Sequence, residues 1–178
     1  MKSGWAVWIT GLPASGKSTI AQSLVKTLED RGGQVQVLES DVLRKIFTPQ
    51  PRYTPEERET FYQGMIHIGV LLTSNGVNVI FDATANRRRW RDEARERIPR
   101  FMEVYVDTPL EVCMNRDPKG IYHKASEGKA STVPGKQEAY ESPEAPEVRV
   151  DGSAPANHAV QTILAAMRTH GFDVPSLA

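Results

Sequence analysis

Cysteine is almost absent from this sequence: Cys113 is the only one, so no disulfide can form within the chain. A single thiol also excludes a zinc site built from several cysteines. Long apolar runs are missing too, which excludes a membrane-spanning helix. The apolar stretch at residues 5–9 is too short for the core of a secretory signal. From these absences we expect a cytoplasmic protein without a membrane partner.

Net charge is lacking as well, because 22 lysines and arginines balance 22 aspartates and glutamates. A neutral chain has no overall field that would attract nucleic acid, so nucleic acid is not expected as a partner. The hydrophobic fraction of 39% and the charged fraction of 25% are typical of a globular protein rather than a disordered one. A length of 178 residues fits one domain of ordinary size.

Apolar runs of strand length alternate along the chain with segments of helical periodicity. The expected strands are residues 5–10, 34–38, 77–81, 101–106 and 148–150. The expected helices are residues 17–31, 54–74, 87–98, 109–116 and 157–169. Thr54, Pro55 and Glu57 have the spacing of a helix N-cap with a capping box. This alternation predicts an α/β fold of three layers, α/β/α, around a mainly parallel five-stranded sheet.

A glycine-rich loop follows the first expected strand. Residues 11–19 read Gly-Leu-Pro-Ala-Ser-Gly-Lys-Ser-Thr and match the phosphate-binding pattern G-x-x-x-x-G-K-[ST] in full. In such a P-loop the backbone N–H groups surround the phosphates, Lys17 reaches the β- and γ-phosphates, and the Ser18 hydroxyl is a ligand of Mg²⁺. The expected contacts to ATP are Gly11, Pro13, Ala14, Ser15, Gly16, Lys17, Ser18 and Thr19.

The class of nucleotide enzyme follows from what accompanies the loop. The sequence has no Asn-Lys-x-Asp motif for reading guanine, which argues against a GTPase. Residues 117–146 are rich in lysine, serine, proline and glycine, and a connection of this length is usually a functional lid or a disordered excursion. We therefore predict that residues 1–178 form a single P-loop kinase domain that uses ATP and Mg²⁺ and carries a lid at about 117–146.

Acidic side chains follow the second expected strand. Glu39 and Asp41 would lie at the carboxyl edge of the sheet, beside the γ-phosphate. Asp41 is the candidate general base that accepts or orients the proton of the acceptor hydroxyl, although an aspartate at this point could instead cap a helix. Arg44 is the candidate for holding anionic groups. The expected catalytic residues are Lys17, Asp41 and Arg44.

The third expected strand also ends in polar residues. Asp82 is a candidate outer ligand of Mg²⁺ or the start of an Asx turn, and Thr84 is a candidate contact to substrate or lid. Of the arginines that follow, Arg87 or Arg88 lies near enough to the strand end to contact an anionic substrate. Most of the others are expected to form a solvated helix face, paired with the acidic residues at 92–96.

Several segments together resemble a known family. Residues 104–113 read Val-Tyr-Val-Asp-Thr-Pro-Leu-Glu-Val-Cys, and residues 116–122 read Arg-Asp-Pro-Lys-Gly-Ile-Tyr. With the P-loop, residues 39–44 and residues 140–147, they resemble the adenylylsulfate (APS) kinases over nearly the whole chain. The resemblance implies transfer of the ATP γ-phosphoryl group to the 3′-hydroxyl of adenylylsulfate, which gives 3′-phosphoadenylylsulfate and ADP.

The resemblance also assigns roles to particular residues. Arg116 is expected near the adenine of ATP, and the lid with Lys119 is expected to close over both nucleotides. A homodimer is expected, with Trp5 and Trp8 either buried or at the interface. The residues expected at the acceptor nucleotide are Glu39, Tyr53, Arg58, Asp82, Thr84, Arg87, Lys119 and Val133.

The acceptor side departs from the family's pattern. The family has Asp-Gly-Asp-Asn-x-Arg where residues 39–44 read Glu-Ser-Asp-Val-Leu-Arg, and Asn-Ile-Arg-Arg where residues 61–64 read Phe-Tyr-Gln-Gly. Its Phe-Ile-Ser-Pro strand end is replaced by Ala-Thr-Ala-Asn at residues 83–86. The lid phenylalanine that would stack on the acceptor's adenine is replaced by Val133, while Tyr53 could supply the opposite aromatic face.

These departures keep two alternatives open. Asp82-Ala83-Thr84 followed by arginines is similar to polynucleotide-kinase-like enzymes, so the acceptor could be another hydroxyl, on a sugar nucleotide, a nucleoside or a polynucleotide 5′ end. The second alternative is a non-catalytic ATP-binding sensor. Lys17, Ser18, Asp41 and a long lid argue against it, since mere sensing requires none of them.

Overall fold

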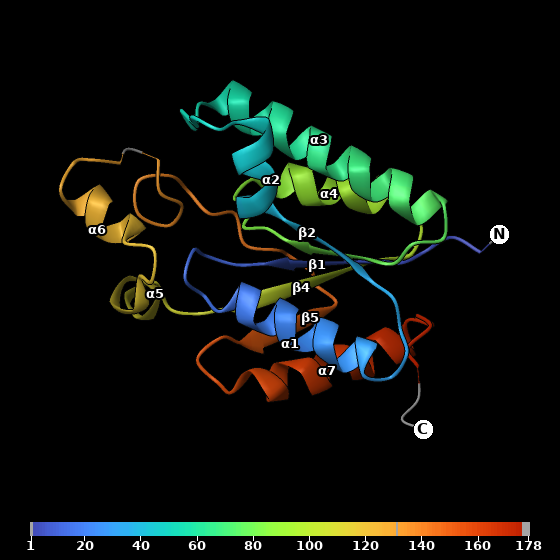
Figure 1. Ribbon diagram of the computed structural model, residues 1–178. Coiled ribbons are helices and arrows are strands. Elements are labelled where there is room, and N and C mark those ends of the chain that lie inside the picture. The colour runs from blue at the N-terminus through green and yellow to red at the C-terminus, as the bar shows by residue number, and fades with distance from the viewer. Residues whose placement is uncertain (1, 131, 176–178) are drawn as a thin grey trace.

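A computed structural model describes residues 2–130 and 132–175. Figure 1 shows a central sheet with helices on both faces. The strands are β1 (Ala6–Thr10), β2 (Gln36–Glu39), β3 (Val79–Asp82), β4 (Phe101–Asp107) and β5 (Val148–Asp151). The helices are α1 (Lys17–Glu29), α2 (Ser40–Phe47), α3 (Pro55–Ser74), α4 (Arg88–Arg97), α5 (Leu110–Arg116), α6 (Ile121–Ser126) and α7 (Ala156–Thr169).

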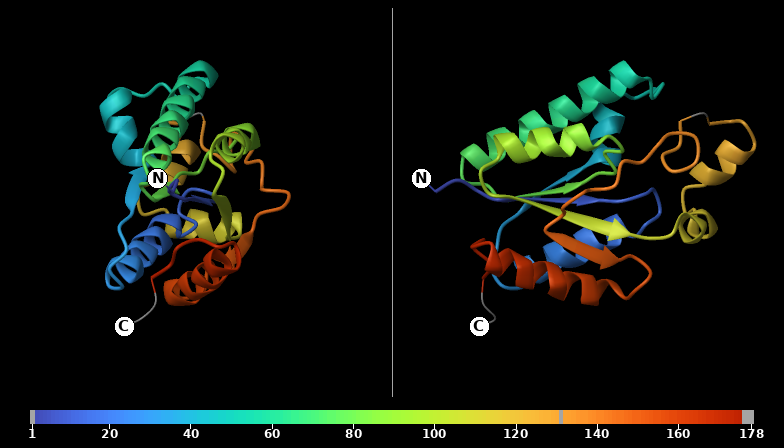
Figure 2. Two further views of the ribbon diagram at one scale, coloured as in Figure 1. Left: turned by 90° about the vertical axis from the view of Figure 1, so that its right-hand side faces the viewer. Right: turned by 180° about the vertical axis from the view of Figure 1, so that it is seen from behind.

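The five-stranded sheet has the order β2-β3-β1-β4-β5, and every pairing within it is parallel. The predicted three-layer α/β fold is therefore confirmed. Because parallel strands all end at one edge, the P-loop after β1 lies beside the ends of β2 and β3. In the right-hand view of Figure 2, α5 and α6 lie beyond this same edge of the sheet.

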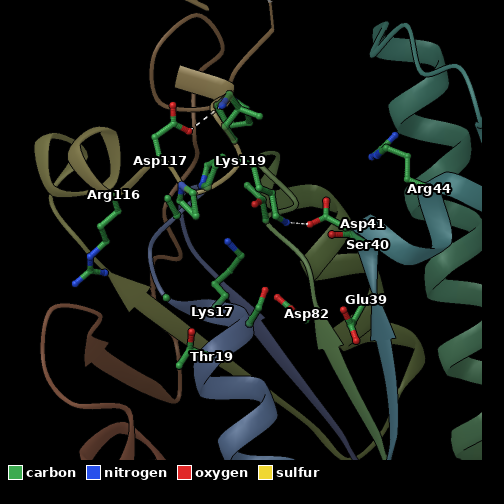
Figure 3. A pocket seen from close by; sticks show the side chains of 18 of the residues that line it. Lys17, Thr19, Glu39, Ser40, Asp41, Arg44, Asp82, Arg116, Asp117 and Lys119 are labelled. Atoms are coloured by element: carbon green, nitrogen blue, oxygen red, sulfur yellow. Dashed lines mark hydrogen bonds and ion pairs between the residues drawn. The ribbon is translucent and has the colours of Figure 1, made fainter. Parts of the chain in front are cut away.

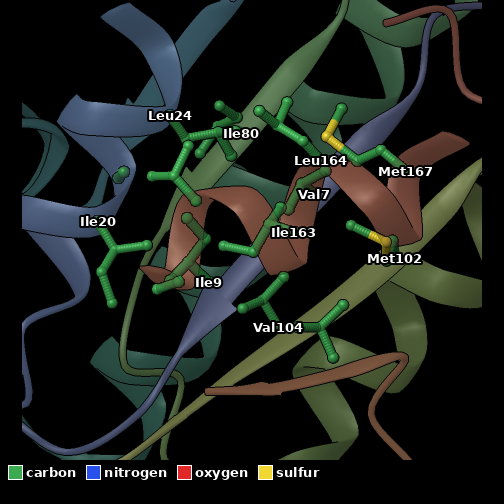
Figure 4. Close-up of a cluster of buried hydrophobic side chains, with 14 of the residues drawn as sticks. Val7, Ile9, Ile20, Leu24, Ile80, Met102, Val104, Ile163, Leu164 and Met167 are labelled. Atoms are coloured by element: carbon green, nitrogen blue, oxygen red, sulfur yellow. The ribbon is translucent and has the colours of Figure 1, made fainter. Parts of the chain in front are cut away.

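Alternation along β1 divides the interior into two layers. Val7 and Ile9 pack with α1 and α7 on one face, as Figure 4 shows, while Trp8 packs with α3 and α4 on the other. Trp8 stacks on Phe81, with ring centroids 4.5 Å apart. Trp5 is also buried. The two tryptophans therefore belong to the interior of the chain rather than to an exposed interface.

Helix α3 begins as the sequence predicts, with one difference in its cap. Thr54 Oγ1 accepts a hydrogen bond from the N–H of Glu57 at 3.2 Å. A capping box would use the N–H of Thr54, but the Glu57 carboxylate accepts from the N–H groups of Tyr53 and Arg52, one and two residues earlier. Glu57 thus orders the turn that precedes the helix, in which Tyr53 has a φ of 57°.

Two helices were absent from the sequence-based prediction. Helix α2 exposes its apolar residues, Val42, Ile46 and Phe47, so its short pattern does not mark a buried face. Helix α6 lies within the predicted lid and begins after Gly120, which has a φ of 63°. The Asp117 carboxylate accepts from the N–H of Ile121 at 2.8 Å and of His123 at 2.9 Å, which caps the helix.

The expected pairing of the α4 arginines within their own helix is mostly wrong. Arg97 does pair with Glu93 in the same helix. Four others reach instead to residues 138–147, which we call the return limb because they lead from the lid back to β5. The ion pairs with it are Arg87–Glu138, Arg87–Glu141, Arg88–Glu144 and Arg95–Glu147, and Arg91 donates to the carbonyl oxygen of Glu141. The return limb is therefore bound along α4, and only the earlier part of the predicted lid extends over the strand ends.

Over the described ranges 2–130 and 132–175, every helix is too short or too polar to cross a bilayer.

Candidate active site

A cavity of about 860 Å³ opens at the carboxyl edge of the sheet, between the P-loop, α2 and the lid (Figure 3). From the P-loop it is lined by Pro13, Ala14, Gly16, Lys17, Ser18 and Thr19. From the strand ends and α2 it is lined by Glu39, Ser40, Asp41, Val42, Arg44, Asp82 and Thr84. From the lid it is lined by Pro118, Lys119, Ile121, Ala130, Thr132, Val133 and Pro134.

The backbone of the P-loop requires glycine at two positions, Gly11 and Gly16. Gly16, the N-cap of α1, has a φ of 103°, and no side chain of the described residues caps this helix. A Cβ atom on Gly11 would lie 2.6 Å from the carbonyl oxygen of Val106, so glycine is required for close packing against β4. The first N–H groups of α1 therefore remain available at the positive end of the helix, where phosphate oxygens bind well.

Lys17 lies in the middle of the loop. Its Nζ donates to the carbonyl oxygen of Leu12 at 2.9 Å, and the side chain is buried. Burial lowers the pKa of Lys17, while the negative charges of Asp82 and Asp41 act in the opposite direction. In Figure 3 the ammonium group extends upward into the cavity between the strand ends and the lid. A cation in this position can neutralise a polyphosphate.

Two carboxylates stand in register at the ends of neighbouring strands, and the one on β3 lies close to Lys17. Glu39 of β2 is in register with Asp82 of β3, which is in register with Ile9 of β1. Asp82 is buried. Its carboxylate accepts no hydrogen bond from a backbone N–H of the described residues, so it does not start an Asx turn. Asp82 thus lies beside the ammonium group of the P-loop, and Glu39 lies one strand farther from it.

Asp41 does not cap α2, because the cap position belongs to Glu39. It lies in the first turn of the helix, where the helix dipole stabilises a carboxylate. Its Oδ2 accepts a hydrogen bond from Lys119 Nζ of the lid, and both side chains remain well exposed. The structure therefore brings the candidate base to the mouth of the cavity, where the lid contacts it.

The far end of the cavity is basic and aromatic. Arg44 is buried with its guanidinium 3.8 Å above the ring of Phe61 and 5.1 Å from that of Tyr53. Its Nη1 atom is buried without a hydrogen-bond partner among the described residues, and the carboxylate of Glu57 is 3.8 Å away. Such a buried, unsatisfied cation is suited to an anionic group of a ligand.

Arg58 reaches the same end of the cavity from α3. Its Nε donates to the carbonyl oxygen of Tyr53 at 3.1 Å, its Nη1 to Asn86 Oδ1 at 3.3 Å and its Nη2 to the carbonyl oxygen of Thr132 at 2.7 Å. Burial lowers the pKa of Arg58. The guanidinium is thus fixed by three segments of the chain.

The other end of the cavity includes residues that the sequence analysis missed. Arg116 Nη1 donates to the carbonyl oxygen of Gly152 at 2.9 Å. A Cβ on Gly152 would lie 2.2 Å from the carbonyl oxygen of Ser15, so the turn after β5 packs directly on the P-loop. Gly152, Ala154 and Ala156 all line the cavity. Because the last expected strand belongs to a parallel sheet, the residues just after it should lie at the carboxyl edge, and this signal could have identified these three residues.

The remaining expected site residues fall into three groups. Thr84 lines the cavity, and its carbonyl oxygen accepts from Thr10 Oγ1 at 2.7 Å. Val133 lines the cavity but also packs in a small lid cluster with Tyr122. Gly11, Ser15 and Arg87 do not line it, and the Arg87 guanidinium is bound by the return limb.

Comparison with known proteins agrees with this geometry. The sequence model of the adenylylsulphate kinase family matches residues 3–151. The probable adenylyl-sulfate kinase of Pyrococcus abyssi is 43% identical over 150 residues, which cover 84% of this chain and 86% of that protein. That of Archaeoglobus fulgidus is 40% identical over 147 residues, covering 83% and 95%.

Solved structures agree as well. The Mycobacterium tuberculosis APS kinase CysC, in complex with AMPPNP and APS, superposes with a TM-score of 0.88 at 30% identity, covering 94% of this chain and 99% of that one. A gluconokinase from Sinorhizobium meliloti, at 18% identity and a TM-score of 0.58, shares the fold alone. The phosphate-binding loop, the carboxylates beside it, the lid and these matches lead to one conclusion: the chain belongs to the adenylylsulphate kinase family.

Proposed function

We propose that this protein transfers the γ-phosphoryl group of ATP to the 3′-hydroxyl of adenylylsulfate, giving 3′-phosphoadenylylsulfate and ADP. The observation that carries the proposal is the family match over residues 3–151, which includes the P-loop, Asp41 and the whole of the lid. The cavity supports it, because a phosphate-binding loop and a basic, aromatic end lie in one space of about 860 Å³. That volume is large enough for two nucleotides held end to end.

In this proposal ATP lies along the P-loop. The N–H groups at the start of α1 bind its phosphates, Lys17 neutralises the β–γ region, and Arg116 lies at the adenine end. The donor set also fits Mg²⁺: Ser18 and Asp82 both line the cavity and offer the oxygen ligands that this ion prefers. When bound, Mg²⁺ would neutralise charge on the phosphate oxygens.

The acceptor occupies the opposite end. Arg44 and Arg58 hold its anionic groups, and Tyr53 offers an aromatic face to its base. Asp41 accepts the proton of the 3′-hydroxyl as the oxygen attacks the γ-phosphorus. For this step Lys119 must leave Asp41, and its charge is then free to contact the phosphates as the lid excludes water.

The test is an acceptor screen with γ-labelled ATP. We expect label on adenylylsulfate at low micromolar acceptor concentration, and none of comparable rate on sugars, nucleosides or oligonucleotide 5′ ends. Label only on one of those other acceptors would reject the proposal in favour of a kinase with a different substrate. ATP binding without turnover on any acceptor would indicate a nucleotide sensor instead.

We also propose that the chain forms a homodimer. The exposed apolar residues Ile46 and Phe47 of α2, which lie outside the cavity, offer surface that a second copy could cover. A related structure is described as a hexameric APS kinase from Thiobacillus denitrificans, of which this chain covers 30%. Sedimentation should give twice the chain mass of 19.8 kDa at micromolar concentration, and a monomer would contradict the proposal.

A further inference from the structure

Asn86 lies where the family pattern noted above has proline, and it connects two parts of the site. The side chain is buried, four residues after the end of β3. Its Oδ1 accepts from Arg58 Nη1 at 3.3 Å, and its Nδ2 donates to the carbonyl oxygen of Ala139 at 3.1 Å. Its own carbonyl oxygen accepts from the N–H of Glu141 at 2.9 Å. One residue thus joins the acceptor end of the cavity to the return limb.

The bonds to Arg58 leave part of its guanidinium free. A guanidinium has five N–H donors, and three of the Arg58 donors are used by Tyr53, Asn86 and Thr132. The other two have no partner within residues 2–130 and 132–175, and they belong to a side chain that lines the cavity. Their direction is set by the three bonds, because the group is planar and rigid.

The same bonds reach both ends of one loop of the lid. Arg58 holds the carbonyl oxygen of Thr132, just before the loop at residues 133–138, and Asn86 holds that of Ala139, just after it. Within the loop the carbonyl oxygen of Val133 accepts from three N–H groups, so the loop is a compact unit. Its residues Val133 and Pro134 line the cavity.

We propose that Asn86 is a positioning residue that couples Arg58 to this loop, so that Arg58 presents its two free donors to the acceptor only while the loop is docked. The proposal deepens the proposed function and rests on it for the identity of the acceptor. Without Asn86, Arg58 keeps its charge but loses the bond that orients it, and the return limb loses its hold beside Ala139. Binding of the acceptor weakens, whereas the ATP end of the cavity is unaffected.

The experiment compares Asn86→Ala with a matched control, Asn78→Ala. Asn78 is also a bridging asparagine, since its Oδ1 accepts from the N–H of Trp5 and its Nδ2 donates to the carbonyl oxygen of Gln34, both at 3.2 Å. It stands before β3, at the opposite edge of the sheet from the cavity. Both variants should lower the melting temperature. Only Asn86→Ala should raise the KM for adenylylsulfate, by about tenfold, as expected for loss of a hydrogen bond to a charged group, with the KM for ATP unchanged.

A second variant separates coupling from simple anchoring of Arg58. Asn86→Asp keeps an acceptor for Arg58 but cannot donate to Ala139, so it should show a raised KM as well. A wild-type KM in Asn86→Asp, or equal KM values in Asn86→Ala and Asn78→Ala, would overturn the proposal.

Trypsin cleavage after Lys136, an exposed residue of the loop, gives a readout independent of turnover. We expect faster cleavage in Asn86→Ala than in Asn78→Ala with AMPPNP bound, and equal rates would contradict the coupling. If the wild-type protein does not phosphorylate adenylylsulfate, the proposed function fails, and the cleavage rates still decide whether Asn86 docks the loop.

Discussion

In the proposed reaction, Asp41 is the side chain on which proton transfer depends most directly. It lies in the first turn of α2 at the mouth of the cavity, across from Lys17. Removing a general base typically lowers turnover by two to four orders of magnitude. We therefore expect Asp41→Ala to lower kcat by about two orders of magnitude or more, while Asp92→Ala, at an exposed position of α4, leaves kcat unchanged. Near-normal turnover of Asp41→Ala would remove it from the mechanism.

A change at Lys17 tests the proposed ATP end of the site. Burial removes water from the Lys17 ammonium group and disfavours the positive charge. A bound polyphosphate would supply negative charge that stabilises it. Lys17→Ala should lower kcat/KM for ATP by about two orders of magnitude. Lys26→Ala changes a solvent-exposed lysine of the same helix and serves as the control. Equal kinetics of the two variants would show that Lys17 does not contact the phosphates.

At the scale of elements, a buried arginine links α4 both to β4 and to the return limb. Arg91 is fully buried, pairs with Glu103 of β4 at 2.6 Å and donates to the carbonyl oxygens of Ala85 and Glu141. Breaking a buried pair leaves an uncompensated charge, so Arg91→Ala should lower the free energy of unfolding by about 3–5 kcal/mol. Arg97→Ala breaks a more exposed pair and should cost less than about 1 kcal/mol.

Urea denaturation of both variants measures this difference. Replacing Glu103 by Leu in the Arg91→Ala background should recover part of the loss, because it removes a buried carboxylate that then keeps only its 3.5 Å contact with Arg95. Equal losses in Arg91→Ala and Arg97→Ala would mean that the buried pair does not hold α4 in place.

The return limb shows why the ion pairs of the α4 arginines could not be predicted from neighbouring residues alone. An arginine row with acidic neighbours normally predicts pairing within the helix. Here glutamates at 138, 141, 144 and 147 lie along α4 and take most of the arginines instead. Helix α2 was missed for a different reason, since it is only eight residues long and three of its apolar side chains are exposed.

For the molecule as a whole, acid stability should depend on this limb. The main-chain N–H of Arg88 and the guanidinium of Arg87 hold the pKa of Glu141 below its ordinary value of 4.5. A pKa that is lower in the folded state adds stability above pH 4.5, and this stability is lost as the pH falls through the folded-state value.

We therefore expect the free energy of unfolding to decrease on acidification from pH 4.5, and to decrease less steeply in Glu141→Gln. Denaturation curves over a pH series measure the two slopes. Identical slopes would mean that the Glu141 carboxylate is no better stabilised in the folded protein than in the unfolded chain.

The sequence was sufficient for the sheet and for the position of the P-loop and the carboxylates near it, because local patterns mark them, whereas the turn at Gly152, which also lines the cavity, was missed. The P-loop occupies nine consecutive residues, and the carboxyl edge of a parallel sheet fixes where Asp82 and Glu39 must lie. The acceptor end could not be predicted in the same way. Arg58, Asn86 and Ala139 meet through contacts that span up to 53 positions, and no spacing rule connects them.

The contact between Lys119 and Asp41 bears on what the proposed base can do before the acceptor binds. A carboxylate engaged by an ammonium group is a poor proton acceptor, so in the proposed reaction this contact would limit hydrolysis of ATP by water before the acceptor binds. Both side chains are about 60% exposed, at 60% and 63%, so separating them costs less than about 1 kcal/mol. In the proposed reaction, the hydroxyl of the substrate can thus displace Lys119 from Asp41 at a small cost in free energy. Water in the absence of substrate meets a carboxylate that is already hydrogen-bonded.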